Sequence, residues 1–85
     1  MNIMEEIKLK VRNFVVDNFL FGNANGLADD TSFLEAGILD STGVLEVVAF
    51  LEQQFGVRVD DDELTPENLD SISSIGAFVS RKLQV

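Results

Sequence analysis

The stretch that decides the fold is residues 39–56, which read LDSTGVLEVVAFLEQQFG. Apolar side chains recur in it at the spacing of one helix face. They are Val44, Leu45, Val47, Val48, Leu51 and Phe55. Asp40 or Ser41 would cap the start of such a helix, and Gly56 suits the position just past its end. The stretch therefore predicts a helix over residues 41–55.

One long helix is predicted on each side of this stretch. Residues 3–20 carry an apolar stripe at helical spacing, with Asn2 as a candidate cap. The stripe consists of Ile3, Ile7, Val11, Phe14 and Val15. A last helix is expected over residues 72–83, capped by Ser71. Its stripe consists of Ile72, Ile75, Val79 and Leu83.

The two connections between these helices differ in kind. The run Gly22-Asn23-Ala24-Asn25-Gly26 stops the first helix and opens a loop that reaches about residue 40. Four apolar residues are expected to pin this loop to the core, namely Phe33, Leu34, Ile38 and Leu39. After the acidic run at residues 60–63, Thr65-Pro66-Glu67 is typical of one short helical turn capped by Thr65. The predicted fold is all-α, a four-helix bundle of three longer helices and one short one, in a single domain over residues 1–85.

Composition excludes most catalytic chemistry. The 85 residues contain no Cys and no His, so disulfides, thiol nucleophiles, Cys-based zinc sites and imidazole bases are all missing. A Ser–Lys pair remains possible in principle, but the bases lie mostly near the chain ends, far in sequence from Ser41. Neither acidic run has the glycine that a calcium-binding EF-hand loop requires. We therefore expect no enzyme and no metal site.

Charge is concentrated in the middle of the chain. The net charge is −9, and residues 29–70 hold twelve acidic residues against Arg58 alone. Such acidity argues against nucleic acid or an anionic membrane as the partner, and favours basic patches on other proteins. The simpler interpretation of these acidic residues is that they form a solvated face that keeps a small domain soluble. No apolar run is long enough to span a bilayer, and the N-terminus lacks the features of a signal peptide, so we expect a cytoplasmic location. We also expect the chain to be a monomer.

The pair Asp40-Ser41 on its own is an ordinary helix cap. In its context, with the acidity and the helix order, the chain resembles the acyl carrier protein family, which holds a 4′-phosphopantetheine arm on a serine. The matching segments are Leu39-Asp40-Ser41, residues 44–48, residues 51–57, residues 33–38 and residues 66–72. The resemblance covers roughly residues 3–83.

The resemblance implies a role for particular residues. Ser41 would carry the arm, taken from coenzyme A by a phosphopantetheinyl transferase, and Asp40 would support that modification. A face of the second helix would meet partner enzymes, through Thr42, Leu45, Glu46, Ala49 and Glu52. An acyl chain would find shelter among Phe33, Val47, Leu51, Val59, Leu69, Ile72 and Ile75, which also suit an ordinary core.

These implications predict a carrier that moves acyl groups as thioesters between a loading ligase and downstream acyl-processing enzymes. Many fatty-acid carriers have Leu and then an acid after the serine, where this chain has Thr42 and Gly43, and Asp60 replaces a common proline. A specialised pathway is therefore expected rather than routine fatty acid synthesis. Two alternatives remain open: an aminoacyl or peptidyl carrier loaded by an adenylating ligase, and an unmodified acidic helical adaptor.

Overall fold

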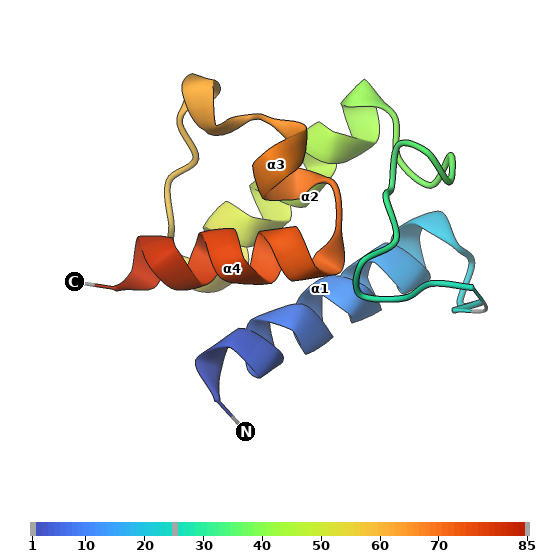
Figure 1. Cartoon of the computed structure of the whole chain (residues 1–85), viewed down its shortest axis with the longest axis horizontal. Helices are drawn as coiled ribbons and strands as arrows, with labels where there is room; N and C mark the ends of the chain where they lie inside the picture. Colours follow the sequence, from blue (N-terminus) through green and yellow to red (C-terminus); the bar gives the residue numbers. More distant parts are fainter. Residues whose placement is uncertain (1, 25, 85) are drawn as a thin grey trace.

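The computed structural model describes residues 2–24 and 26–84. Met1 and Val85, at the ends of the predicted domain, and Asn25, in the predicted helix stop, lie outside the described residues. The chain forms α1 (Ile3–Phe19), α2 (Ser41–Phe55), a 3-10 helix η1 (Asp61–Glu63), the short α3 (Pro66–Leu69) and α4 (Ile72–Leu83) (Figure 1). The all-α bundle of three longer helices and one short one is confirmed.

Side-chain caps set the starts of the three longer helices. The Asn2 carboxamide accepts a hydrogen bond from the Glu5 N–H at 2.9 Å, and the Asp40 carboxylate accepts one from the Gly43 N–H at 2.8 Å. The Ser71 hydroxyl accepts one from the Ser74 N–H at 3.0 Å. Each such bond satisfies a backbone donor that the helix itself leaves without a partner. The cap predictions are confirmed for these helices, whereas Thr65 precedes α3 without a capping bond from its side chain.

One apolar core joins the helices and the long loop. Its fully buried members include Ile7, Val11 and Val15 from α1, and Ile75 and Val79 from α4. Helix α1 packs along α4, as Figure 1 shows. Four residues of the predicted stripes and loop anchors lie outside the core and are exposed, namely Ile3, Leu34, Leu45 and Leu83. Ile3, in the first turn of α1, is 52% exposed, and Leu34 in the loop is 48% exposed.

The loop over residues 20–40 is anchored near its middle by Asp29. Its carboxylate lies 2.7 Å from the Arg12 guanidinium and 2.9 Å from the Lys8 ammonium. The Asp29 backbone carbonyl accepts a hydrogen bond from the Ser73 N–H at 2.8 Å, which joins the loop to the start of α4 (Figure 1). The hydrogen bond from Arg12, followed by that from Lys8, holds the pKa of Asp29 below its usual value. We call this group the Asp29 anchor.

The acidic run after α2, for which the sequence analysis predicted no helix or strand, contains η1. Glu63 closes this turn by accepting a hydrogen bond from the Asp60 N–H at 2.9 Å, and it pairs with Lys82 of α4 at 2.8 Å. The Lys82 ammonium, and secondly the Asp60 N–H, lower the pKa of Glu63. A base near the chain end thus offsets part of the charge of the acidic run.

Two kinds of feature are absent from the described part of the chain. None of the helices formed by residues 2–24 and 26–84 has the length and apolar character needed to cross a bilayer. The same residues contain no group of three or more His, Cys, Asp or Glu side chains arranged to hold a metal ion.

Candidate functional site

Ser41 is the first residue of α2, and its side chain is exposed to solvent. The preceding residue, Asp40, caps the helix with its carboxylate and is exposed as well. The first N–H groups of a helix have no partner within it, and they give this end a partial positive charge. The hydroxyl of Ser41 is therefore accessible at a place where a negatively charged ester would be stabilised.

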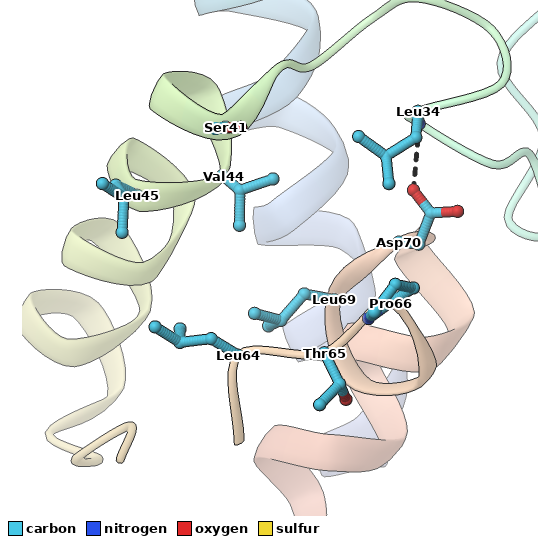
Figure 2. A pocket seen from close by; sticks show the side chains of 9 residues that line it. All are labelled: Leu34, Ser41, Val44, Leu45, Leu64, Thr65, Pro66, Leu69 and Asp70. Atoms are coloured by element: carbon cyan, nitrogen blue, oxygen red, sulfur yellow. Dashed lines mark hydrogen bonds between the residues drawn. The ribbon is translucent and has the colours of Figure 1, made fainter. Parts of the chain in front are cut away.

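An apolar groove of about 330 Å³ lies beside Ser41. Its walls come from the loop, α2, the link before α3, and α3 itself (Figure 2). The lining residues are Leu34, Ser41, Val44, Leu45, Leu64, Thr65, Pro66, Leu69 and Asp70. Figure 2 shows Val44 and Leu45 on α2 facing Leu64 and Leu69 across the groove. The serine hydroxyl thus lies at the edge of a largely apolar depression.

The predicted partner face follows α2 away from Ser41. Each of its five residues lies three or four positions from at least one other of the set, which places them on neighbouring turns of one side of the helix. They are Thr42, Leu45, Glu46, Ala49 and Glu52, and all five are exposed. Leu45 is 57% exposed, a large apolar side chain with little cover. Glu52 also has a structural contact, because its carboxylate accepts a hydrogen bond from the Val59 N–H at 2.9 Å.

Close packing around residue 43 favours glycine at this position. A Cβ atom at this position would lie 3.0 Å from Leu39 Cδ2 and 3.3 Å from Phe19 Cε1. A side chain at residue 43 would therefore crowd the end of α1 and the end of the loop. The local packing favours glycine at this position, which departs from the common fatty-acid pattern.

The apolar residues expected to shelter an acyl chain form the core. Phe33, Val47, Leu51, Leu69, Ile72 and Ile75 are buried, and Val59 is partly buried. Of this set, Leu69 also lines the groove beside Ser41. The depression next to the serine is built mainly from other residues, chiefly Leu34, Leu45 and Leu64.

Asp70 is the residue of this site that the sequence analysis missed. It follows α3, lines the groove, and accepts hydrogen bonds from the Ser32 hydroxyl and from the Leu34 N–H. No local pattern signals this role, because its partners lie 36 and 38 positions earlier in the chain.

The known proteins that are similar to this chain include carrier proteins and proteins with a phosphopantetheine attachment site. Residues 20–79 match the family model described as "Phosphopantetheine attachment site". The chain is 32% identical over 75 residues to the "Probable acyl carrier protein PigG" of Serratia sp. (strain ATCC 39006), covering 88% of this chain and 86% of that protein. It is 30% identical to an "Acyl carrier protein" of Lactobacillus acidophilus, covering 89% of this chain and 88% of that protein.

Two solved structures share the fold. The chain in "Structure of KstB-PCP(apo)" superposes with a TM-score of 0.74 at 38% identity, over 94% of this chain and 88% of that chain. A chain in "Crystal structure of FAD-dependent dehydrogenase" gives 0.73 at 32% identity, over 81% of this chain and 97% of that chain.

Proposed function

The chain belongs to the family of phosphopantetheine-binding carrier proteins, and from this premise we propose that Ser41 is the residue that bears the arm. The observation that supports this most directly is the exposed Ser41 hydroxyl at the start of α2, directly after the Asp40 cap. The family is one of carriers and not of enzymes. The chain thus acts as a single carrier domain whose task is to present its cargo.

The residues around Ser41 fit a phosphopantetheine arm. The open N-terminal end of α2 favours the negative charge of a phosphodiester on the serine oxygen. The apolar groove begins at Ser41 itself, so it offers a surface for the apolar part of an arm or its cargo. When bound, the arm supplies a terminal thiol that holds cargo as a thioester, and this accounts for a carrier without Cys or His of its own.

The chain's own contribution to the attachment is a nucleophilic oxygen in an accessible place. Ser41 presents the oxygen that becomes part of the phosphodiester. Asp40 caps the start of α2 and supplies a carboxylate next to Ser41. We place the base that accepts the hydroxyl proton on the transferase, since Lys8, Lys10 and Lys82 are each paired with a carboxylate elsewhere in the chain.

Partner enzymes are proposed to dock on the exposed face of α2. Glu46 and Glu52 supply negative charge there, and Leu45 and Ala49 supply apolar surface between them. Electrostatic attraction to a basic patch speeds encounter without demanding tight binding, which suits a protein that visits several enzymes in turn. The partners are a phosphopantetheinyl transferase, a loading ligase and acyl-processing enzymes.

For the cargo, we propose an acyl group of a specialised pathway. An aminoacyl or peptidyl cargo, loaded by an adenylating ligase, is the second candidate. It is favoured by the 38% identity to the chain in "Structure of KstB-PCP(apo)". Incubating the modified chain with ATP, an adenylating ligase and single amino acids, and measuring its mass, separates the two. The family match favours either carrier over the unmodified adaptor, while the monomeric state and the cytoplasmic location stay predictions.

The attachment residue is tested by the intact mass of the protein. The chain is incubated with coenzyme A, magnesium and a promiscuous phosphopantetheinyl transferase. We expect a gain of one phosphopantetheine, lost in Ser41→Ala and kept in Thr42→Ala, which removes the neighbouring exposed hydroxyl. A gain that persists in Ser41→Ala would place the arm on another residue, and no gain beside a working control carrier would refute the proposal.

A further inference from the structure

We propose that Asp70 is a positioning residue that holds Leu34 as one wall of the groove beside Ser41, and thereby shelters a neutral, apolar acyl thioester there. This inference rests on the proposed function, because the thioester is carried on Ser41.

Asp70 fastens the loop with both its side chain and its backbone. One carboxylate oxygen accepts a hydrogen bond from the Leu34 N–H at 2.9 Å, the other from the Ser32 hydroxyl. Its backbone carbonyl accepts one from the Phe33 N–H at 2.8 Å. The Ser32 oxygen in turn accepts one from the Glu35 N–H at 3.1 Å. We call this set of bonds the Asp70 clip.

The Asp70 clip fixes the position of Leu34, a residue that is not fixed by burial in the core. Phe33 is fully buried and fixes the loop to the core, whereas the next residue, Leu34, is 48% exposed and lines the groove. The bond from its N–H to Asp70, drawn in Figure 2, sets the position of its backbone at the groove wall. Breaking the clip is therefore expected to move the wall while leaving Phe33 in the core.

The lining of the groove indicates which cargo suits it. Leu34, Leu45 and Leu64 are all more than a third exposed, and all three face the depression that starts at Ser41. An aliphatic group carried on Ser41 would cover them and so remove apolar surface from water. No cationic side chain lines the groove, and the carboxylate of Asp70 does. A neutral, apolar acyl group therefore fits better than one that ends in a carboxylate.

Ser32 offers the cleanest test because it belongs to the clip but does not line the groove. A hexanoyl arm is transferred to the chain from hexanoyl-coenzyme A, and cleavage of the thioester by hydroxylamine is followed by mass. We expect the wild-type thioester to be cleaved more slowly than hexanoyl-coenzyme A. In Ser32→Ala, loss of the two hydrogen bonds that the Ser32 hydroxyl makes, to Asp70 and from the Glu35 N–H, should speed cleavage about three- to tenfold. Ser32→Thr, which keeps the hydroxyl, should restore protection.

The matched control is Asp29→Ala, which loosens the same loop at the Asp29 anchor, away from the groove. It should lower the free energy of unfolding while leaving the cleavage rate within a factor of about two of wild type. Equal cleavage rates in wild type and Ser32→Ala would overturn the proposal. So would an equal acceleration in Asp29→Ala, since general loosening of the loop would then explain the effect.

A second measurement uses the unmodified protein and so separates this inference from the proposed function. Exchange of the Leu34 amide hydrogen with solvent should be faster in Ser32→Ala and unchanged in Asp29→Ala. Unchanged exchange in Ser32→Ala would overturn the clip even if the arm attaches as proposed. Failure of the arm to attach, with the exchange result as expected, would refute the attachment on Ser41 and leave the clip in place.

Discussion

Asp40 contributes to the site in two ways that a substitution can separate. Its carboxylate oxygen caps α2 by accepting the Gly43 N–H, and its charge lies next to Ser41. Asn keeps a cap oxygen without the charge, whereas Ala removes both. We expect Asp40→Ala to lower the free energy of unfolding by about 0.5–2 kcal/mol and Asp40→Asn by a few tenths at most. Urea unfolding of the two variants measures this difference.

The same pair tests the role of the charge in attachment. If Asp40 supports the modification through its carboxylate, both variants should be modified more slowly than wild type by the transferase. Rapid modification of Asp40→Asn, together with slow modification of Asp40→Ala, would instead assign the effect to the helix cap.

Gly76 allows α4 to approach α1 closely. A Cβ atom on this residue would lie 2.6 Å from Lys8 Cγ, a carbon too near the backbone to move away freely. We expect Gly76→Leu to lower the free energy of unfolding by about 1–3 kcal/mol, because the extra atoms overfill this contact and displace Lys8 from Asp29. Thermal unfolding measures the loss. Arg81→Lys, which keeps the positive charge in the exposed last turn of the same helix, should change stability by no more than about 0.5 kcal/mol.

At the scale of elements, the helices could be predicted from the sequence because their determinants are local. Stripes at helical spacing and the caps Asn2, Asp40 and Ser71 gave the bounds of α1, α2 and α4 to within a residue. That the five residues of the proposed partner face share one side of α2 could also be predicted, because residues three or four positions apart on a helix are neighbours. Their contact with a partner enzyme, which the family resemblance implies, stays a prediction.

The loop could be predicted only in part, and η1 was not predicted at all, because distant residues hold both of them. Asp29 is fixed by Lys8, Arg12 and the start of α4, and Glu63 by Lys82. The exposure of Leu34 also depends on Asp70, which lies 36 residues further along. A local pattern of apolar residues cannot tell a core anchor from a groove wall, because the difference lies in what packs against each from elsewhere.

The Asp29 anchor makes the loop sensitive to acid. The pKa of Asp29 is lower in the folded state than its usual 3.8, so its ionised form stabilises the fold, fully above about pH 5 and progressively less as pH falls through the folded-state pKa. Asp29→Asn lacks this titration. We therefore expect wild type to exceed Asp29→Asn in free energy of unfolding at pH 6, and the difference to shrink below about pH 4.

Urea unfolding at a series of pH values measures that difference. Asp30→Asn removes an exposed carboxylate from the next position and is the matched control. It should show no comparable convergence with wild type on acidification. A constant gap between wild type and Asp29→Asn from pH 6 to pH 3 would contradict the assignment.

At the scale of the whole molecule, the net charge of −9 works against folding. The extents of the molecule are 35 × 30 × 20 Å, comparable with a Debye length of about 30 Å at 0.01 M salt and well above the length of about 10 Å at 0.1 M. Raising NaCl from 0.01 to 0.15 M should therefore relieve repulsion across the molecule. We expect the melting temperature to rise, by about 4–8 °C for each kcal/mol of stability gained.

A charge variant provides the control for this salt effect. Asp61→Lys with Asp62→Lys changes two exposed residues of η1 and brings the net charge from −9 to −5. The variant should melt higher than wild type at low salt and respond less to added NaCl. An equal response in both proteins would show that ion binding at some other place, and not overall repulsion, causes the stabilisation.

The Asp70 clip also has a consequence for the time course of folding. Helical contacts close over a few residues, but the bond from Ser32 to Asp70 closes a span of 38 residues, which costs more chain entropy. The individual helices should therefore form before the clip, and we expect the transition state to lack it. Stopped-flow kinetics would then show Ser32→Ala unfolding faster while refolding at the wild-type rate. The loop next to Ser41 would be the last part of the chain to settle and the first to detach.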